Sequence, residues 1–190
     1  SREGSRAWPA PTGEVDADWI PGEGAGAVVL KPLEQAQADE DVIHAVAESV
    51  AFARGITPDS VAGAAAVALE SAGVAPEQVG FVSMHASGIL EDAAAEVAGL
   101  QQIYSEAALG RASAHIGHTC AASGMASLLQ ATLALRQHTI PGVPDWDRSE
   151  PAKAWGSGQC YAPTKSRPWF CNAGDEPRRA AVSSLGQDGC

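Results

Sequence analysis

The sequence predicts an α/β fold in which a sheet is layered with helices, and three observations support this. Short apolar segments alternate with longer segments in which apolar residues recur every three to four positions, the pattern of strands with covering helices. Glycine-containing turns follow two of the apolar segments. No internal repeat or low-complexity segment interrupts the order. We therefore expect a mixed sheet with helices on its faces and a long coil before the last strand.

The first third of the chain is predicted to hold two strands. Residues 1–18 contain Pro, Gly and Trp without periodicity and are expected to be a linker or the start of a fragment. Residues 26–33 are apolar and would end as a strand near Pro32, because proline cannot donate to a ladder. Residues 34–41 are acidic and are expected to form a loop. Residues 42–53 are apolar and β-branched, which predicts the second strand.

Helices and strands alternate regularly further along the chain. A helix should begin at Thr57–Pro58, where Thr57 can cap the first turn, and stop at Gly73. Apolar runs predict further strands, and amphipathic periodicity predicts further helices. These elements are expected at residues 79–84 (strand), 91–105 (helix), 112–116 (strand), 123–137 (helix) and 179–184 (strand).

Residues 139–177 differ from the rest in composition. They hold six prolines and three of the five tryptophans. A long proline-rich segment inside a domain is unusual unless it wraps a surface or serves a site. We expect this segment to be the long coil, and residues 186–189 to form a tight turn near the end.

Charge and cysteine usage exclude several classes of protein. The chain has 12 basic and 23 acidic residues, for a net charge of −11, which disfavours nucleic acid and anionic membranes as partners. No apolar run approaches the roughly 20 residues of a membrane span. The expected reduced cysteines suggest a cytoplasmic protein. The spacing of the four cysteines fits no zinc pattern. We expect reduced thiols and no metal, although one disulfide bond stays possible.

Two histidines carry most of the functional signal. His85 and His118 each lie in a short glycine-containing turn between a predicted strand and a predicted helix. Turns of this kind face a common crevice in α/β folds, so the two rings are expected to meet in one pocket. Paired imidazoles can stabilise an oxyanion and move a proton near neutral pH. The alternative is a pair of buried histidines that serve only as hydrogen-bonding groups in a non-catalytic domain.

Five stretches, in the same order and at similar intervals, resemble the C-terminal half of a β-ketoacyl synthase, a condensing domain with the thiolase fold. They begin at Trp19 and extend over nearly the whole remaining chain. The Arg-Pro-Trp sequence in the fifth stretch is similar to polyunsaturated-fatty-acid and polyketide synthases. The stretches are residues 19–30, 85–88, 116–119, 133–136 with 140–141, and 166–169 with 178–186.

The resemblance implies a decarboxylative Claisen condensation of malonyl and acyl thioesters. In that family a cysteine thiolate holds the acyl chain, and two histidines assist decarboxylation and stabilise the enolate. The implied partners are acyl carrier protein, whose phosphopantetheine arm carries the substrate, and an N-terminal ketosynthase half, and a dimer is expected. No other cofactor is implied. The matching positions are His85 and His118 as catalytic residues and Ser87, Gly88, Thr119 and Gly186 as substrate-binding residues.

The departures from the family pattern leave the activity open. The nucleophilic cysteine belongs to the family's N-terminal half, and Cys120 follows the histidine motif instead of standing at the nucleophile position. The family's lysine before the second histidine falls at Ser113, its asparagine at His115, and a glycine of the first turn at Ala86. The alternatives are therefore a non-catalytic, dimerising partner of the chain-length-factor type and, more remotely, an acyltransferase that does not condense. In every case we expect no condensation by this chain alone.

Overall fold

The computed structural model describes residues 20–144, 146, 160–171 and 177–186. Its centre is a three-stranded parallel sheet in which β1 (Val79–Met84) lies between β2 (Ala108–Arg111) and β5 (Arg179–Val182). A separate antiparallel pair is formed by β3 (Thr139–Ile140) and β4 (Arg167–Pro168). The predicted α/β class is confirmed.

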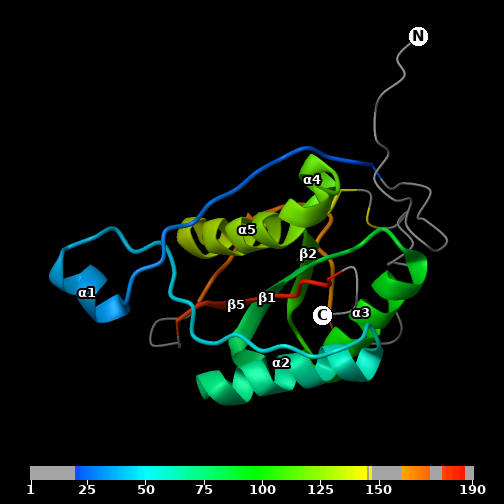
Figure 1. Cartoon of the computed structure of the whole chain (residues 1–190), viewed down its shortest axis with the longest axis horizontal. Helices are drawn as coiled ribbons and strands as arrows, with labels where there is room; N and C mark the ends of the chain where they lie inside the picture. The colour runs from blue at the N-terminus through cyan, green and yellow to red at the C-terminus, as the bar shows by residue number, and fades with distance from the viewer. Residues whose placement is uncertain (1–19, 145, 147–159, 172–176, 187–190) are drawn as a thin grey trace, which may run out of the picture.

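Helices cover the sheet on both faces. Figure 1 shows α2 (Pro58–Ala72) and α3 (Leu90–Ile103) together on one side and α5 (Ser123–Gln137) on the other. Short helical turns fill the connections between these elements, namely α4 (Ser113–Ile116), η1 (Pro76–Gln78) and η2 (Cys120–Ala122). The strand order β2-β1-β5 makes β1 the central strand, so the loop after β1 lies at the middle of the carboxyl end of the sheet.

Local capping explains where α2 begins and ends. The Thr57 side chain accepts from the Ser60 backbone N–H, and the Ser60 hydroxyl accepts from the Thr57 N–H in return. This reciprocal pair satisfies two of the N–H groups that a helix start leaves open. Gly73 ends the helix in the left-handed conformation, with φ of 64°. Both predicted boundaries are confirmed.

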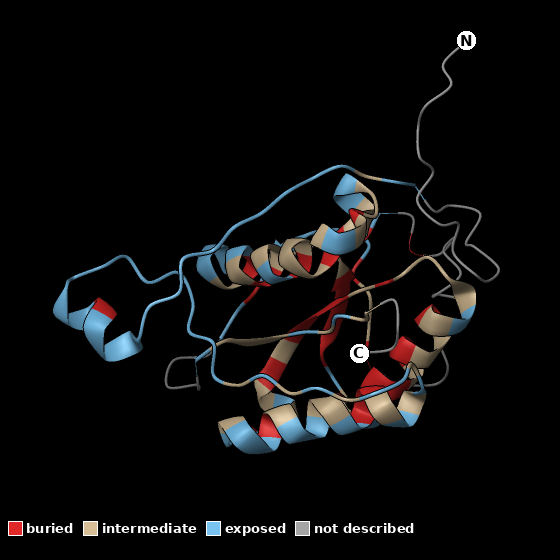
Figure 2. Ribbon diagram, in the orientation of Figure 1, coloured by how far each residue is buried: buried red, intermediate tan, exposed pale blue. Residues whose placement is uncertain are grey.

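The core consists of two hydrophobic clusters, one on each face of β1. Val82 and Met84 pack with residues of α2 and α3, whereas Phe81 packs on the other face against Ala131 and Ala134 of α5. Figure 2 shows this strand almost wholly buried. Burial on both faces explains why β1 is mostly apolar and does not alternate between apolar and polar residues, with Ser83 as its one polar residue.

The two predicted N-terminal strands are absent. Residues 26–32 and 42–53 have no ladder, and between them α1 (Leu33–Ala38) replaces the predicted loop at residues 34–41. Their apolar side chains are exposed, as in Val29 (98%) and Phe52 (88%), and α1 stands apart from the layers (Figures 1 and 2). A strand needs a neighbouring strand for its backbone hydrogen bonds, and none adjoins these segments in the part of the chain described.

The predicted strand at 112–116 is also wrong. The strand in this region is β2, which begins at Ala108, and Ser113–Ile116 forms α4 instead. Ala108 and Leu109 pair with β1 and are completely buried there, so the strand lies earlier in the chain than predicted. The helix predicted at 91–105 and the strand predicted at 179–184 exist as α3 and β5, with slightly different ends.

The described parts of residues 139–177 wrap the sheet edge. They contain β3, β4 and the buried Trp169, and Tyr161 forms an isolated parallel bridge to Ala108 at the start of β2. The predicted linker at 1–18, most of the predicted coil and the turn that continues past Gly186 lie outside the described residues. Within the described residues, no helix combines the length and the apolar character needed to cross a membrane.

Candidate active site

The first histidine follows the central strand directly. His85 comes after Met84, the last residue of β1, and its backbone N–H donates to Oε1 of Glu96 at 2.8 Å. The next N–H, of Ala86, donates to Oε2 of the same carboxylate at 2.9 Å. Ala86 has φ of 49°, so the chain turns sharply here and directs the loop away from the sheet.

The second histidine lies in a loop fixed by the beginning of the described chain. The His118 N–H donates to the Ile20 carbonyl at 2.8 Å, and the Gly22 N–H donates to the His118 carbonyl at 2.9 Å. Gly117, just before the histidine, has φ of 75° and ψ of 175°, a region open essentially only to glycine. Its missing side chain lets the two backbones approach closely.

The two imidazoles meet edge to face. The centroids of the His85 and His118 rings are 5.4 Å apart, and the ring planes make an angle of 86°. The rings come from segments separated by α3, β2 and α4, yet they share one site. The predicted convergence of the two histidines is confirmed, whereas their catalytic role stays a prediction.

A backbone hydrogen bond selects the tautomer of His118. The Cys120 N–H donates to Nδ1 of His118 at 3.2 Å. In the neutral ring this nitrogen is therefore the acceptor, and the proton resides on Nε2. Nε2 is itself buried, so the N–H donor of this ring lies in a water-poor site.

Partial burial favours the neutral form of both rings. It lowers the pKa of His85, and the nearby Asp92 carboxylate opposes this shift. Burial also lowers the pKa of His118, and the charge of His85 lowers it further. Two neutral imidazoles can donate N–H groups to a developing oxyanion without a charge that must first be desolvated.

Three of the four predicted substrate-binding residues, Ser87, Gly88 and Thr119, lie in these two loops. Gly88 has φ of 83°, and the Ser87 hydroxyl accepts from the Ile89 N–H at 3.2 Å. Thr119 is buried beside Ser123, and their hydroxyl oxygens are 3.4 Å apart. Gly186 is half-buried after the end of β5. Their contact with substrate stays a prediction.

Other candidates point elsewhere. His115 directs Nε2 to the Gly142 carbonyl at 2.9 Å, away from the histidine pair. Cys160 is buried and donates to the Tyr104 carbonyl, and burial raises the pKa of its thiol. The thiols of Cys120, Cys160 and Cys171 are all free. In the part of the chain described, no three His, Cys, Asp or Glu side chains gather as a metal site would require.

Sequence reasoning missed Glu96. This residue of α3 has a relative exposure of 1%, although glutamate is rarely buried. Its position in the sequence carried a signal, because it lies three residues after Ala93 and four before Leu100 on the apolar side of the helix. A carboxylate there needs buried donors, and the first histidine loop supplies two of them.

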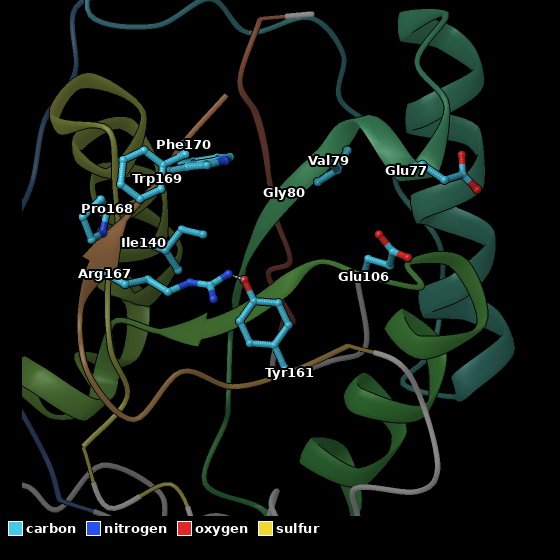
Figure 3. A pocket seen from close by; sticks show the side chains of 10 residues that line it. All are labelled: Glu77, Val79, Gly80, Glu106, Ile140, Tyr161, Arg167, Pro168, Trp169 and Phe170. Atoms are coloured by element: carbon cyan, nitrogen blue, oxygen red, sulfur yellow. Dashed lines mark hydrogen bonds between the residues drawn. The ribbon is translucent and has the colours of Figure 1, made fainter. Parts of the chain in front are cut away.

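In the described part of the chain, two of the concave regions that border the sheet are lined by neither His85 nor His118, although His115 lines one of them. A groove of about 410 Å³ runs between residues 24–26 and α5, and Thr119 lines it. A pocket of about 430 Å³ lies at the amino ends of β1 and β2, opposite the histidines. Figure 3 shows Arg167 over the ring of Tyr161 on one wall and Glu77 and Glu106 on the other. The candidate active site is instead at the carboxyl end of the sheet, because His85 directly follows β1 and His118 lies beyond the end of β2.

Comparisons with known proteins agree with this geometry. Residues 42–146 match the family model described as "Beta-ketoacyl synthase, C-terminal domain". The chain is 35% identical over 196 residues to polyketide synthase ThaQ of Burkholderia thailandensis, covering 93% of this chain and 9% of that protein. It is 32% identical over 188 residues to polyketide synthase PksL of Bacillus subtilis, covering 90% of this chain and 4% of that protein.

Solved structures show the same likeness. The oxazolomycin ketosynthase domain OzmH KS7 of Streptomyces albus matches with a TM-score of 0.74 and 26% identity, over 84% of this chain and 30% of that one. The module 6 ketosynthase of the Bacillus subtilis bacillaene synthase matches with a TM-score of 0.69 and 28% identity, over 84% and 31%. These likenesses confirm the predicted thiolase-like half. The chain spans under a third of either structure and under a tenth of the two synthases.

Proposed function

The chain belongs to the β-ketoacyl synthase family through its C-terminal domain, and on that basis we propose that it supplies the two-histidine half of a polyketide ketosynthase site. The proposed reaction is the decarboxylative condensation of malonyl and acyl thioesters carried on acyl carrier protein. The single observation that carries the proposal is the 5.4 Å approach of the His85 and His118 rings. Two neutral N–H donors in one partly buried site suit an enolate oxygen.

The proposed chemistry uses each part of this geometry. The carboxylate of the malonyl thioester leaves as carbon dioxide, and the electron pair of the broken carbon–carbon bond forms an enolate. The Nε2–H of His118 donates to the enolate oxygen, with His85 as its partner across the site. The α-carbon then attacks the acyl thioester, a new carbon–carbon bond forms, and the cysteine thiolate of the N-terminal half leaves.

The exposed apolar surface supports the proposed partner. The segments at 28–30 and 42–52 expose Val29, Leu30 and Phe52 at 82% or more, and Leu133 of α5 is 49% exposed. Exposed apolar patches of this kind mark interaction surfaces. We infer that the N-terminal half packs here and supplies the neighbouring strands that residues 26–32 and 42–53 lack.

The first prediction tests the proposed function. The purified chain, given malonyl and acyl groups on acyl carrier protein, should form no ketoacyl product, because the nucleophile belongs to the other half. Mixing it with a cysteine-bearing N-terminal ketosynthase half should restore condensation. Mass spectrometry of the carrier protein detects the product, and sedimentation shows whether the two chains associate.

Sustained product from the chain alone, or an associated pair without decarboxylation, would contradict the proposal. The second outcome would favour the chain-length-factor type.

The second prediction concerns pH. Because burial lowers the pKa of both histidines below 6.5, the rings stay neutral above that value and become protonated only as the pH falls through the lowered pKa values. The decarboxylation rate of the associated pair should therefore decline only below pH 6.5. Decarboxylation is the suitable readout because it requires no acylated cysteine.

Asp92 provides the matched variant for this pH profile. Its carboxylate raises the pKa of His85, so Asp92→Asn should move the acid limb to still lower pH. An acid limb at or above pH 6.5, or an Asp92→Asn limb displaced upward, would show that neutral imidazoles are not the active form.

A further inference from the structure

Glu96 connects three separate parts of the fold through one carboxylate. Oε1 accepts the His85 N–H at 2.8 Å and the Ser183 hydroxyl at 2.5 Å, and Oε2 accepts the Ala86 N–H at 2.9 Å. Glu96 belongs to α3, the two N–H groups to the loop after β1, and Ser183 directly follows β5. The Ser183 N–H also donates to the Ser83 carbonyl at 2.9 Å, which holds the serine against β1.

Burial of this carboxylate is unfavourable by itself. Glu96 is 1% exposed, and burial raises the pKa of its carboxyl group while the three hydrogen bonds oppose that shift. The partners are two backbone N–H groups and a hydroxyl, so none of them is a cation. An apolar side chain would fill the same helix position without this desolvation penalty. The retained carboxylate therefore points to a requirement of the loop that it binds.

The loop after β1 needs a hydrogen-bond acceptor that holds its backbone in place. Ala86 is a non-glycine residue with φ of 49°, a conformation that side chains disfavour and that persists only where neighbours hold it. The backbone N–H groups of His85 and Ala86 converge on one anion, which fixes both peptide planes. Because the His85 side chain leaves the backbone between these two groups, fixing them sets the position of its ring.

We propose that Glu96 is the positioning residue for His85, because its two carboxyl oxygens accept both backbone N–H groups of the turn, with the Ser183 hydroxyl after β5 as its support. The catalytic consequence rests on the proposed function, but the positioning itself does not. An amide in place of the carboxylate has one acceptor oxygen instead of two. Glu96→Gln therefore leaves at least one of the two backbone N–H groups without an acceptor, although its shape is nearly unchanged.

The test is nuclear magnetic resonance on the full chain, with wild type, Glu96→Gln, Ser183→Ala and Glu70→Gln compared. Glu70 is an exposed glutamate of α2 and serves as the matched control. In Glu96→Gln, exchange protection of the His85 or Ala86 amide should fall about tenfold or more. The ring-to-ring nuclear Overhauser contact of His85 and His118 should weaken, and the pKa of His85 should move towards its ordinary value as water enters. Ser183→Ala should give the same changes at smaller size, and Glu70→Gln none.

These readouts separate a positioning role from a merely structural one. If Glu96→Gln keeps the ring contact and the His85 titration of the wild type, the proposal is wrong, even if the variant is less stable. If Glu96→Gln does not fold, Ser183→Ala decides by the same two readouts. Changed His85 readouts together with no decarboxylation by the wild-type pair would leave the positioning role standing and refute only the proposed function.

Discussion

Replacing His118 by alanine is expected to lower the rate of malonyl thioester decarboxylation about 10²–10³-fold in the pair formed with the N-terminal half. The variant removes the Nε2–H donor that the Cys120 backbone selects by occupying Nδ1. Because Nε2 of His118 is itself buried, we expect that water does not replace the lost donor without loosening the loop. The rate should fall mainly in kcat, since the donor acts on charge that develops in the transition state.

His115 provides the matched control for this prediction. It is the same residue type three positions earlier, but its ring bonds to the Gly142 carbonyl instead of facing His85. His115→Ala should retain decarboxylation within a few fold of the wild type, while circular dichroism shows that both variants fold. Equal losses in the two variants, or an unchanged rate in His118→Ala, would remove the histidine pair from the mechanism.

The elements that the sequence predicted well are those whose own residues carry the signal, either as an apolar run buried on both faces or as a long periodic pattern. The strand at 79–84 is buried on both faces, and the helix at 123–137 has a long periodic pattern, so both bounds agree with β1 and α5. The strand at 108–111 escaped prediction because its sequence, Ala-Leu-Gly-Arg, is short and has little apolar volume. Its identity as β2 depends on β1 beside it and on the Tyr161 bridge at its start.

The apolar segments at 26–33 and 42–53 show the opposite failure. Their composition predicts strands, but a strand forms only beside another strand that accepts its backbone hydrogen bonds. Whether such a partner is present cannot be inferred from the sequence of the segment itself. The same limit applies to the site. Convergence of His85 and His118 followed from the rule that loops at one sheet edge face a common crevice. The Glu96 contact is made by a side chain of α3 to the loop after β1. No sequence motif of that loop predicts such a contact.

Gly117→Ala is the second large effect that we expect. The backbone at Gly117 lies in a glycine-only region, with φ of 75° and ψ of 175°. A β-carbon there would lie 2.8 Å from the Gly22 nitrogen and 3.0 Å from the Ile20 carbonyl oxygen. These backbone atoms belong to the segment that hydrogen-bonds to His118 on both sides. Strain and collision together should lower the free energy of unfolding by about 3 kcal/mol or more.

Gly73→Ala separates these two causes. Gly73 also has a positive φ, 64°, but nothing lies within 4 Å of the position that its β-carbon would take. Its replacement should therefore cost only about 1 kcal/mol for the left-handed backbone. Urea unfolding of both variants measures the difference, and the excess in Gly117→Ala reports the collision with residues 20–22. Because relief of that collision must move either those residues or His118, the variant should also lose most decarboxylation in the associated pair. A loss of stability no larger than that of Gly73→Ala, with normal decarboxylation, would mean that the contact with residues 20–22 does not hold His118 in place.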